Sequence, residues 1–374
     1  MNLPHHRLFV LGAGFSKPAG FPLAMELLED VRESIRWIYR EGNKFEQEIQ
    51  EWIDLYPGTC IDLERVLAYS HRKHYLQLSG SDEYFDHDSV SIVIALREVQ
   101  QKLIDSTPSA APALYRQFAR RLCPHDVVLT FNYDTLLEQA LDEIGKQYTL
   151  TPEYWLEGGD SHESRKYVDL LKLHGSIDWY DRYYLDSAMR SYAEKGLDVP
   201  NRDPIFGPNP TVPTEPLSRG QTGELGRHLL SRVFRVPNHA AYFPIEGGLG
   251  SRVVPFILPP AYDKLLGYNA IVDLWRGLHR TLDAFSSIVM IGYSMPAHDS
   301  YAYEALGRVF VDYQRGGDKT YWQQRRVPIQ IVTADCSDQS AIKRIPFLDG
   351  DKTRVWHRGF SIESLDWIDW GDGK

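Results

Sequence analysis

The stretch Leu8–Ser16, LFVLGAGFS, decides the fold of this chain, because it joins an apolar strand to a glycine turn. Gly20-Phe21-Pro22 and a segment with helical periodicity follow it. Glycines let the backbone turn tightly and approach a pyrophosphate closely, and the amide groups at the start of the helix after Pro22 are expected to face the anion. The stretch therefore predicts a phosphate site for a dinucleotide, to which Ser16 adds a hydroxyl donor.

The spacing of the glycines differs from that of dehydrogenases. Gly12 and Gly14 are separated by one residue, and Gly20 comes six positions after Gly14, so the GxGxxG fingerprint is not met. Taken alone, a glycine turn after a strand can also be a simple chain reversal. Other segments of the chain have to decide between the two interpretations.

Three further segments place polar residues directly after an apolar strand, at 127–134, 170–176 and 288–294. Open α/β sheets bind their ligands at the carboxyl ends of the strands, so we expect these segments to converge on one edge of a parallel sheet. The candidate site residues are Thr130, Asn132, Asp134, His174, Gly292 and Ser294, together with Gly12, Ala13, Gly14 and Ser16 of the glycine turn.

The apolar periodicity predicts an α/β fold: a Rossmann-like parallel sheet with helices on both faces, plus a helical module. Helical patterns cover 23–40, 45–55, 62–78, 88–104 and 108–122, and we expect 31–120 to form the module. The core then comprises 1–30 and 121–374, with helices at 135–144, 271–285 and 299–310 and strands at 253–258, 288–291 and 327–332. Prolines between about 181 and 250 predict an irregular insertion beside the site.

Charge and composition narrow the possible functions. The chain has 374 residues with 41 Lys and Arg against 51 Asp and Glu, and a formal charge of −10 argues against direct nucleic-acid binding. There is no GxxxxGKS loop, so we do not expect the chain to hydrolyse ATP. The N-terminus lacks a positive region followed by a long apolar run, and no segment approaches ~20 apolar residues, so we expect a cytoplasmic protein without membrane contact.

The three cysteines are isolated, at Cys60, Cys123 and Cys336, as is typical of a reducing compartment. A tetrahedral zinc site with four thiolates needs cysteine pairs at short spacing. We therefore expect no zinc ribbon and no metal at the site.

Four motifs in fixed order, GAGFS with GFP, TFNYD, KLHGS and IGYS, resemble those of the sirtuin-like NAD-consuming domains of bacterial antiphage defence systems. Sirtuin deacylases carry a similar series, with a Gly-Ala-Gly start, a Thr-Gln-Asn-Ile-Asp segment, a His-Gly pair and a Gly-Thr-Ser segment. The resemblance covers the nucleotide-binding core only. Deacylases also carry a four-cysteine zinc ribbon, which this chain cannot build, so the resemblance favours the defence branch.

The resemblance implies a role for each matching residue. Ala13, Gly14 and Ser16 correspond to residues that contact the diphosphate. Asn132 resembles the asparagine beside the nicotinamide ribose, Asp134 the carboxylate near the carboxamide, and His174 the catalytic histidine. Gly292 and Ser294 resemble residues on the phosphate and adenosine side, and Asp335 follows a strand where a contact with the adenosine ribose is expected.

The activity implied by the resemblance is that of an NAD glycohydrolase, which cleaves NAD to nicotinamide and ADP-ribose and acts in antiphage defence by depleting NAD. An amide such as Asn132 can orient water or ribose hydroxyls, and a histidine, with an unperturbed pKa of ~6.5, can serve as the base. The expected partners are NAD, further copies of the chain in a homo-oligomer, and a separate sensor or ATPase subunit, of HerA type in preference to an Argonaute-like protein.

Each candidate residue also has a purely structural alternative. His174 can be a core-edge histidine that bonds a backbone carbonyl. Asn132 and Asp134 can cap the helix that begins near Thr135, and Asp299 or Ser300 is expected to cap the helix at 299–310. For the whole chain, the alternatives are a catalytically silent module that binds NAD or ADP-ribose, and an NAD-dependent protein deacylase without zinc.

Overall fold

The computed structural model describes most of the chain. The described residues are 6–38, 44–76, 78, 90–150, 167–198, 203–217, 233–237, 239–242, 254–258, 275, 278, 285–296, 299–317, 320, 325–334, 342 and 344–371. Candidate site residue Asp335 and most of the expected helix at 271–285 lie outside them. Within that helix, Trp275 and Leu278 are helical and buried, whereas Phe285 begins a strand.

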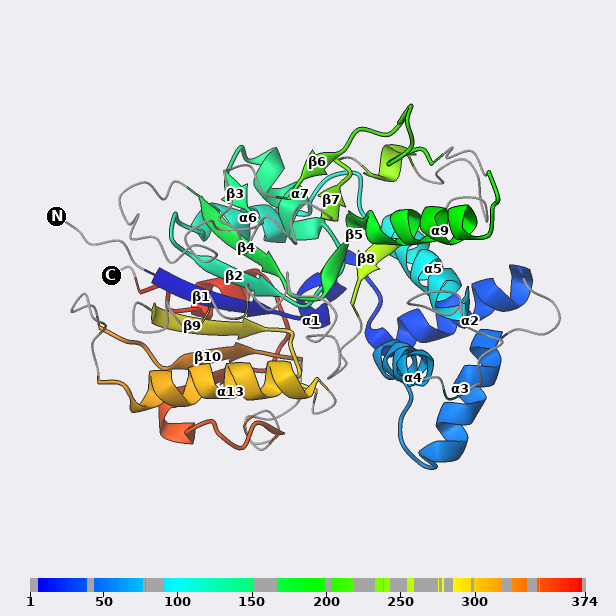
Figure 1. Ribbon diagram of the computed structural model, residues 1–374. Helices are drawn as coiled ribbons and strands as arrows, with labels where there is room; N and C mark the ends of the chain where they lie inside the picture. Colours follow the sequence, from blue (N-terminus) through cyan, green and yellow to red (C-terminus); the bar gives the residue numbers. More distant parts are fainter. Residues whose placement is uncertain are drawn as a thin grey trace.

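A seven-stranded sheet forms one part of the molecule, and all its paired strands run parallel (Figure 1). Its strands, in spatial order, are β11 (Thr353–Trp356), β10 (Ile329–Val332), β9 (Phe285–Ile291), β1 (His6–Leu11), β2 (Val127–Thr130), β4 (Val168–Lys172) and β3 (Tyr148–Thr149). Every residue of β1, β2, β4, β9 and β10 is buried, which explains why these segments read as continuous apolar runs. The predicted α/β class with a Rossmann-like parallel sheet is confirmed.

The strand order reverses beside β1. The chain passes from β1 to β2 and β4 on one side, and then crosses to β9, β10 and β11 on the other. The strand ends are level, because Leu11 pairs with both Thr130 and Ile291, and Ile291 also pairs with Val332. The polar residues that follow β1, β2, β9 and β10 therefore meet at one edge, at the topological switch point where open α/β sheets bind ligands.

Helices and short 3-10 turns connect and cover the sheet. They are α1 (Ala13–Ser16), η1 (Lys17–Ala19), α6 (Ala113–Arg121), α7 (Leu136–Glu143), α13 (Ser300–Arg315), η6 (Gly350–Lys352) and α15 (Ile362–Trp367). Figure 1 shows α13 against the sheet beside β10, and α6 and α7 beside β2 and β4. The turn after β1 leads directly into the one-turn helix α1, not into the helix after Pro22 as expected.

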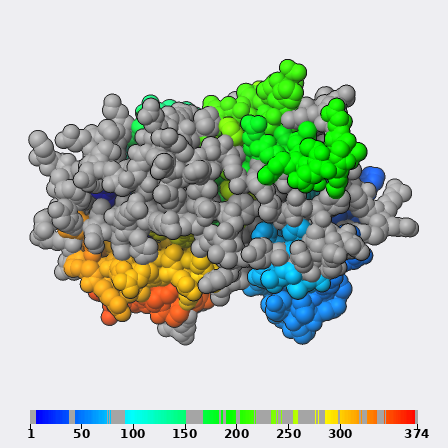
Figure 2. Space-filling model, in the orientation of Figure 1, coloured from blue at the N-terminus to red at the C-terminus, as the bar shows by residue number. Residues whose placement is uncertain are grey.

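Four helices form the additional module: α2 (Ala24–Ile38), α3 (Lys44–Leu55), α4 (Leu63–Tyr75) and α5 (Val90–Ser106). They pack on one another, and most of their buried apolar side chains belong to the same cluster as the sheet. The surface view shows α3 and α4, in blue, on one side of the molecule and the gold and orange C-terminal part on the other (Figure 2). Each predicted helix of the module exists within a few residues of its expected bounds.

The last helix assigned to the module, α6, packs instead against the nucleotide core. Phe118 meets Phe9 of β1 edge to face at 5.5 Å, and the Tyr115 hydroxyl donates to the carbonyl oxygen of Phe15 at 2.8 Å. The amphipathic period predicted this helix correctly but could not say which core its apolar face covers. The surface that α6 covers is formed by β1 and α1, which precede it by about a hundred residues in the chain.

The region expected to be irregular, about 181–250, contributes β6 and β7 to a second, antiparallel sheet. Its strands, in order, are β6 (Glu215–Pro216), β7 (Val233–Arg235), β5 (Gly175–Asp181) and β8 (Pro255–Ile257), with α9 (Tyr183–Glu194) and η3 (His239–Tyr242) beside it. The strand predicted at 253–258 therefore belongs to this sheet and not to the parallel one. The strands β6 and β7, of two and three residues, carry too little alternation to be predicted from the sequence.

Among the described residues, no helix is long and apolar enough to span a membrane.

Candidate functional site

A cavity of about 630 Å³ lies at the carboxyl edge of the parallel sheet, beside the ends of β1 and β9. Eight of the predicted site residues line it: Gly12, Ala13, Gly14, Ser16, Asn132, Asp134, Gly292 and Ser294. Thr333 and Ala334, which follow β10 and directly precede Asp335, line it as well. The GAGFS, TFNYD and IGYS motifs thus meet around this cavity.

Two glycine turns pack backbone against backbone at the base of this cavity. The Gly12 amide donates to the Ile291 carbonyl at 3.0 Å, and the Gly14 amide donates to the Gly292 carbonyl at 2.9 Å. Gly292 has a φ of 62°, and a Cβ atom there would lie 2.3 Å from the carbonyl carbon of Gly14. The glycines are therefore required by the contact between the two turns, whatever ligand the turns bind.

Asn132 connects the glycine turn to the rest of the site. Its Nδ2 donates to the carbonyl oxygen of Gly12 and to Oγ of Ser16, both at 3.0 Å. The Ser16 hydroxyl in turn donates to Oδ2 of Asp134 at 2.8 Å, and Oδ1 of Asp134 accepts the Leu136 amide at the start of α7. The amide nitrogen of Asn132 thus faces the turn, and Asp134 combines its place at the cavity with the capping role considered above.

Thr130 shapes this turn but is not among the residues that line the cavity. Its hydroxyl accepts the backbone amide of Asn132 at 3.1 Å, and its carbonyl accepts the amide of Leu173. The predicted ligand contact by Thr130 is thus replaced by a contact that orients Asn132.

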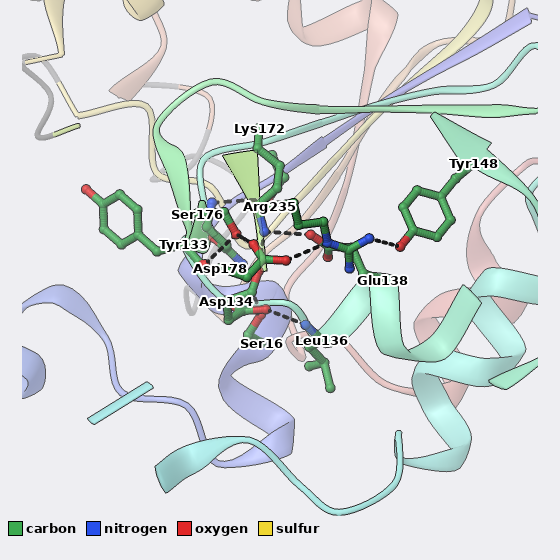
Figure 3. A network of polar contacts seen from close by, with 12 residues as sticks. Ser16, Tyr133, Asp134, Leu136, Glu138, Tyr148, Lys172, Ser176, Asp178 and Arg235 are labelled. Atoms are coloured by element: carbon green, nitrogen blue, oxygen red, sulfur yellow. Dashed lines mark hydrogen bonds and ion pairs between the residues drawn. The ribbon is translucent and has the colours of Figure 1, made fainter. Parts of the chain in front are cut away.

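A buried charged network lies behind Asp134 (Figure 3). Lys172 is fully buried and donates to the carbonyl oxygen of Asp134 at 2.5 Å and to Glu138 at 2.7 Å. In the neighbouring sheet Asp178 pairs with Arg235 at 2.7 Å, and Arg235 donates to the hydroxyl of Tyr148 at 3.0 Å. Ser176 of β5 joins the site turn to the antiparallel sheet, because its hydroxyl lies within hydrogen-bond distance of the Tyr133 carbonyl and of the Asp178 carboxylate.

Burial and the neighbouring cations Lys172 and Arg235 act in opposite directions on the pKa of these carboxyl groups. Burial raises the pKa of Asp134 and of Glu138, in opposition to the nearby Lys172 ammonium. Burial also acts to raise the pKa of Asp178, but Arg235 and Lys172 outweigh it and the pKa is lowered. Asp178 therefore stays ionised, and the positive charges of Lys172 and Arg235 are compensated within the core.

His174 lies one layer behind the cavity. It is 2% exposed and is not a lining residue, because the lining residue Phe131 packs edge-on against its ring, with centroids 4.8 Å apart. Phe131 also stacks on Tyr293 at 4.2 Å, and the Tyr133 ring lies 6.1 Å from the imidazole. The expectation that the imidazole faces the cavity is therefore not met in this conformation, since three aromatic rings stand at that wall.

The imidazole of His174 pairs with a residue that sequence reasoning treated as a helix cap. Its Nε2 lies 3.0 Å from Oδ2 of Asp299, and Asp299 is fully buried. Asp299 does occupy the N-cap position of α13, but its side chain makes no capping hydrogen bond. No sequence signal distinguishes a capping aspartate from one that turns toward a histidine 125 positions earlier.

The helical module contributes charged side chains to the cavity. Asp62 and Glu64 at the start of α4 and Glu26 of α2 line it, as does Arg344. Asp62 caps α4 by accepting the Arg65 amide at 2.9 Å, and Glu26 pairs with Lys17. These residues could not be placed from the sequence, because the packing of the module on the core was not predictable. In the part of the chain that the structure describes, no group of three or more His, Cys, Asp or Glu side chains is arranged to hold a metal ion.

The family model described as a SIR2-like domain matches residues 126–196. This segment is thus similar to SIR2-like domains. It contains β2, α7, β4 and β5, and with them Asn132, Asp134 and His174. The match is confined to this part of the sheet and its continuation, and no curated protein matches the chain.

Several solved structures of sirtuins are similar at low identity. One comes from work on the structural basis of sirtuin substrate affinity and is 13% identical to this chain. The match covers 98% of this chain and 94% of the sirtuin chain, with a TM-score of 0.35. Sir2Tm bound to a propionylated peptide is 11% identical over 97% and 91%, with a TM-score of 0.34. SIR2 in complex with the inhibitor EX-527, 2'-O-acetyl-ADP-ribose and a deacetylated p53 peptide is 12% identical over 97% and 92%, with a TM-score of 0.37.

Proposed function

We propose that this protein is an NAD glycohydrolase that cleaves NAD to nicotinamide and ADP-ribose. The observation that carries the proposal is the cavity at the switch point of the sheet, where two glycine turns and Asn132 meet inside and beside a SIR2-like segment. A volume of about 630 Å³ is within the range of small-molecule sites. Parallel sheets bind nucleotides at this position because strand ends and helix starts present backbone amides there.

In this proposal NAD lies across the two glycine turns. Ala13, Gly14 and Ser16 contact the diphosphate, and the adenosine lies toward Gly292, Ser294 and Thr333, with Asp335 expected nearby. The nicotinamide ribose lies beside Asn132 and Asp134. Carboxylates at the cavity wall, among them Glu64, favour the end of the ligand that carries the positive pyridinium charge.

The proposed reaction is a hydrolysis, in which NAD and water give nicotinamide, ADP-ribose and a proton, so it balances without an oxidant. The bond between C1′ of the ribose and the pyridinium nitrogen breaks, and its electron pair goes to that nitrogen, which leaves as neutral nicotinamide. Water forms the new bond to C1′ through an oxocarbenium-like transition state and gives up a proton. Asn132 orients the water or the ribose hydroxyls, and His174 is the proposed base that takes the proton.

His174 can take that proton only after a rearrangement at the aromatic wall, because Phe131 and Tyr293 separate it from the cavity in this conformation. NAD binding is the event proposed to shift these rings. The same observation favours the second candidate function, a module that binds NAD or ADP-ribose without cleaving it.

The biological role follows from the sequence resemblance alone. We infer an effector of antiphage defence that acts in the cytoplasm by depleting NAD, assembles as a homo-oligomer and is restrained by a separate subunit. A HerA-type ATPase is the preferred partner and an Argonaute-like protein the second. The acidic charge of the chain supports the absence of a direct nucleic-acid contact.

The proposal is tested by incubating the purified chain with NAD, alone and with an acetylated peptide, and by quantifying nicotinamide, ADP-ribose and acyl-ADP-ribose. Equal amounts of nicotinamide and ADP-ribose without peptide support hydrolysis. Acyl-ADP-ribose that forms only with peptide indicates deacylation. Saturable binding of NAD without any product, also when a HerA-type or Argonaute-like partner is added, supports the binding module and rejects hydrolysis.

A further inference from the structure

We propose that Asp299 is a positioning residue for His174, whose carboxylate fixes the ring orientation and tautomer of the imidazole. The inference rests on the proposed function, in which His174 is the base. It also makes a statement about the pair itself that does not depend on turnover.

The geometry of the pair supports this role. The two side chains come from separate crossover units, His174 from the turn after β4 and Asp299 from the start of α13, and they meet at 3.0 Å with almost no exposed surface. A buried carboxylate is stable only when a donor satisfies it. Because both side chains are buried, their contact is a fixed part of the core and not a chance contact at the surface.

Asp299 lies at a capping position, but its side chain does not cap the helix. It occupies the N-cap position of α13, where an aspartate side chain usually accepts the amide two or three residues on. Here that hydrogen bond is not made, and Oδ2 is turned to Nε2 of His174 instead. The contact with the imidazole therefore replaces the helix cap that the position of Asp299 favours.

The backbone of His174 is already fixed, which leaves the ring orientation as the remaining freedom. The His174 carbonyl accepts the Leu258 amide at 2.8 Å, and Gly175, with a φ of 79°, begins β5 so close to Phe256 that a Cβ would lie 1.9 Å from its carbonyl oxygen. Phe131 restricts the ring from one side. The carboxylate of Asp299 selects one orientation within these limits.

The chemistry of the pair follows from its donors and acceptors. An ionised carboxylate only accepts, so Nε2 of the imidazole carries a proton and the basic lone pair is on Nδ1. When the imidazole takes up a second proton, the adjacent negative charge stabilises the imidazolium. Asp299 thereby sets the form in which His174 accepts a proton and favours its acceptance, without touching the substrate.

Other titratable groups face the pair from several elements. Tyr133 follows β2, Tyr293 follows β9 and Tyr301 lies in the first turn of α13, and burial raises the pKa of each well above 10. Asp62 and Glu64 approach the same cluster from α4. Near neutral pH the tyrosines therefore stay uncharged, and changes at His174 there report on the imidazole and the carboxylates around it.

The test combines a titration with kinetics on the full chain. The His174 ring is followed by NMR of histidine-labelled protein, assigned by comparison with His174→Gln, in the wild type, Asp299→Asn and Asp299→Glu. We expect Asp299→Asn to lower the titration midpoint of His174 by about one pH unit or more. We also expect it to lower kcat for NAD hydrolysis about 100-fold, with KM within about twofold. The acidic limb of the kcat profile should shift in the same direction, and Asp299→Glu should recover part of both effects.

Asp312→Asn is the matched control. Asp312 lies on the same helix but pairs with the exposed Arg308, so its loss should change neither the His174 titration nor kcat. An unchanged His174 titration in Asp299→Asn, or a kcat above that of the wild type, overturns the inference. If the wild type does not cleave NAD while the titration shifts as expected, the proposed function fails and the pairing stands. Melting temperatures identify a variant that fails to fold, in which case Asp299→Glu decides.

Discussion

At the scale of single residues, the site is built from contacts that leave little freedom. Asn132, Ser16 and Asp134 form one hydrogen-bonded chain from the glycine turn to α7. The motifs predicted which residues gather, because each follows a buried strand and parallel strand ends share an edge. They could not predict which side chain faces the cavity: Phe131, from another segment, covers His174, and the Thr130 hydroxyl accepts the amide of Asn132 two residues on.

Gly292→Ala tests the contact between the two glycine turns. The added Cβ meets the Gly14 backbone at 2.3 Å and the residue must keep a φ of 62°, so we expect a loss of stability of about 3 kcal/mol or more and loss of NAD binding. Chemical denaturation and calorimetric titration with NAD measure both.

Gly145→Ala is the matched control for Gly292→Ala. Gly145 has a similar φ of 67° but nothing within 4 Å of a Cβ, so only the backbone strain remains, about 1 kcal/mol. Equal losses in the two variants would show that the turn-to-turn contact contributes nothing.

At the scale of elements, the parallel sheet and its helices follow from the sequence, whereas the antiparallel sheet does not. Continuous apolar runs such as β1 and β9 are recognisable because both their faces are buried. Strands β6, β7 and β8 have two or three residues. β7 and β8 pair with β5, and β6 pairs with β7, so their pairing depends on contacts between residues distant in sequence. Beside the buried Lys172, Arg235 of β7 donates to the Tyr148 hydroxyl of β3 and so links the two sheets.

Lys172→Met tests that network. Removing the ammonium leaves Glu138 and the Asp134 carbonyl buried without their donor, so we expect a loss of about 3 kcal/mol in the free energy of unfolding. Lys17→Met removes the same kind of ion pair at the surface, with Glu26, and should change stability by less than about 1 kcal/mol. Urea unfolding of both variants measures the difference, and similar small losses in the two would contradict a structural role for the buried pair.

His239 makes a pH-dependent contribution beside the same network. Burial lowers its pKa below 6.5 in the folded chain, although the Asp178 carboxylate acts in the opposite direction. The unfolded chain therefore binds more protons once the pH falls below about 6.5, and the contribution of His239 to stability is lost progressively from there toward its folded pKa.

We therefore expect the melting temperature of the wild type to fall more steeply between pH 6.5 and 5 than that of His239→Gln, which cannot take up the proton. Melting curves at half-unit pH steps compare the two proteins. Parallel curves over this interval would contradict the assignment.

At the scale of the whole molecule, the cavity combines residues from the core and the helical module. The sheet supplies the glycine turns, Asn132 and Asp134, and α2 and α4 supply acidic side chains at the wall. The module was predictable as a set of helices because each has a clear apolar period, but its docking beside the site was not, since that depends on the surface it meets.

The most direct test of NAD cleavage at this cavity is nicotinamide release from saturating NAD by the wild type and by Asn132→Ala, measured on samples with matched melting temperatures. Asn132 lines the cavity and holds both Gly12 and Ser16, so its removal should lower kcat by about 100-fold or more. Release at the same rate by both proteins would show that NAD is cleaved elsewhere or by another mechanism.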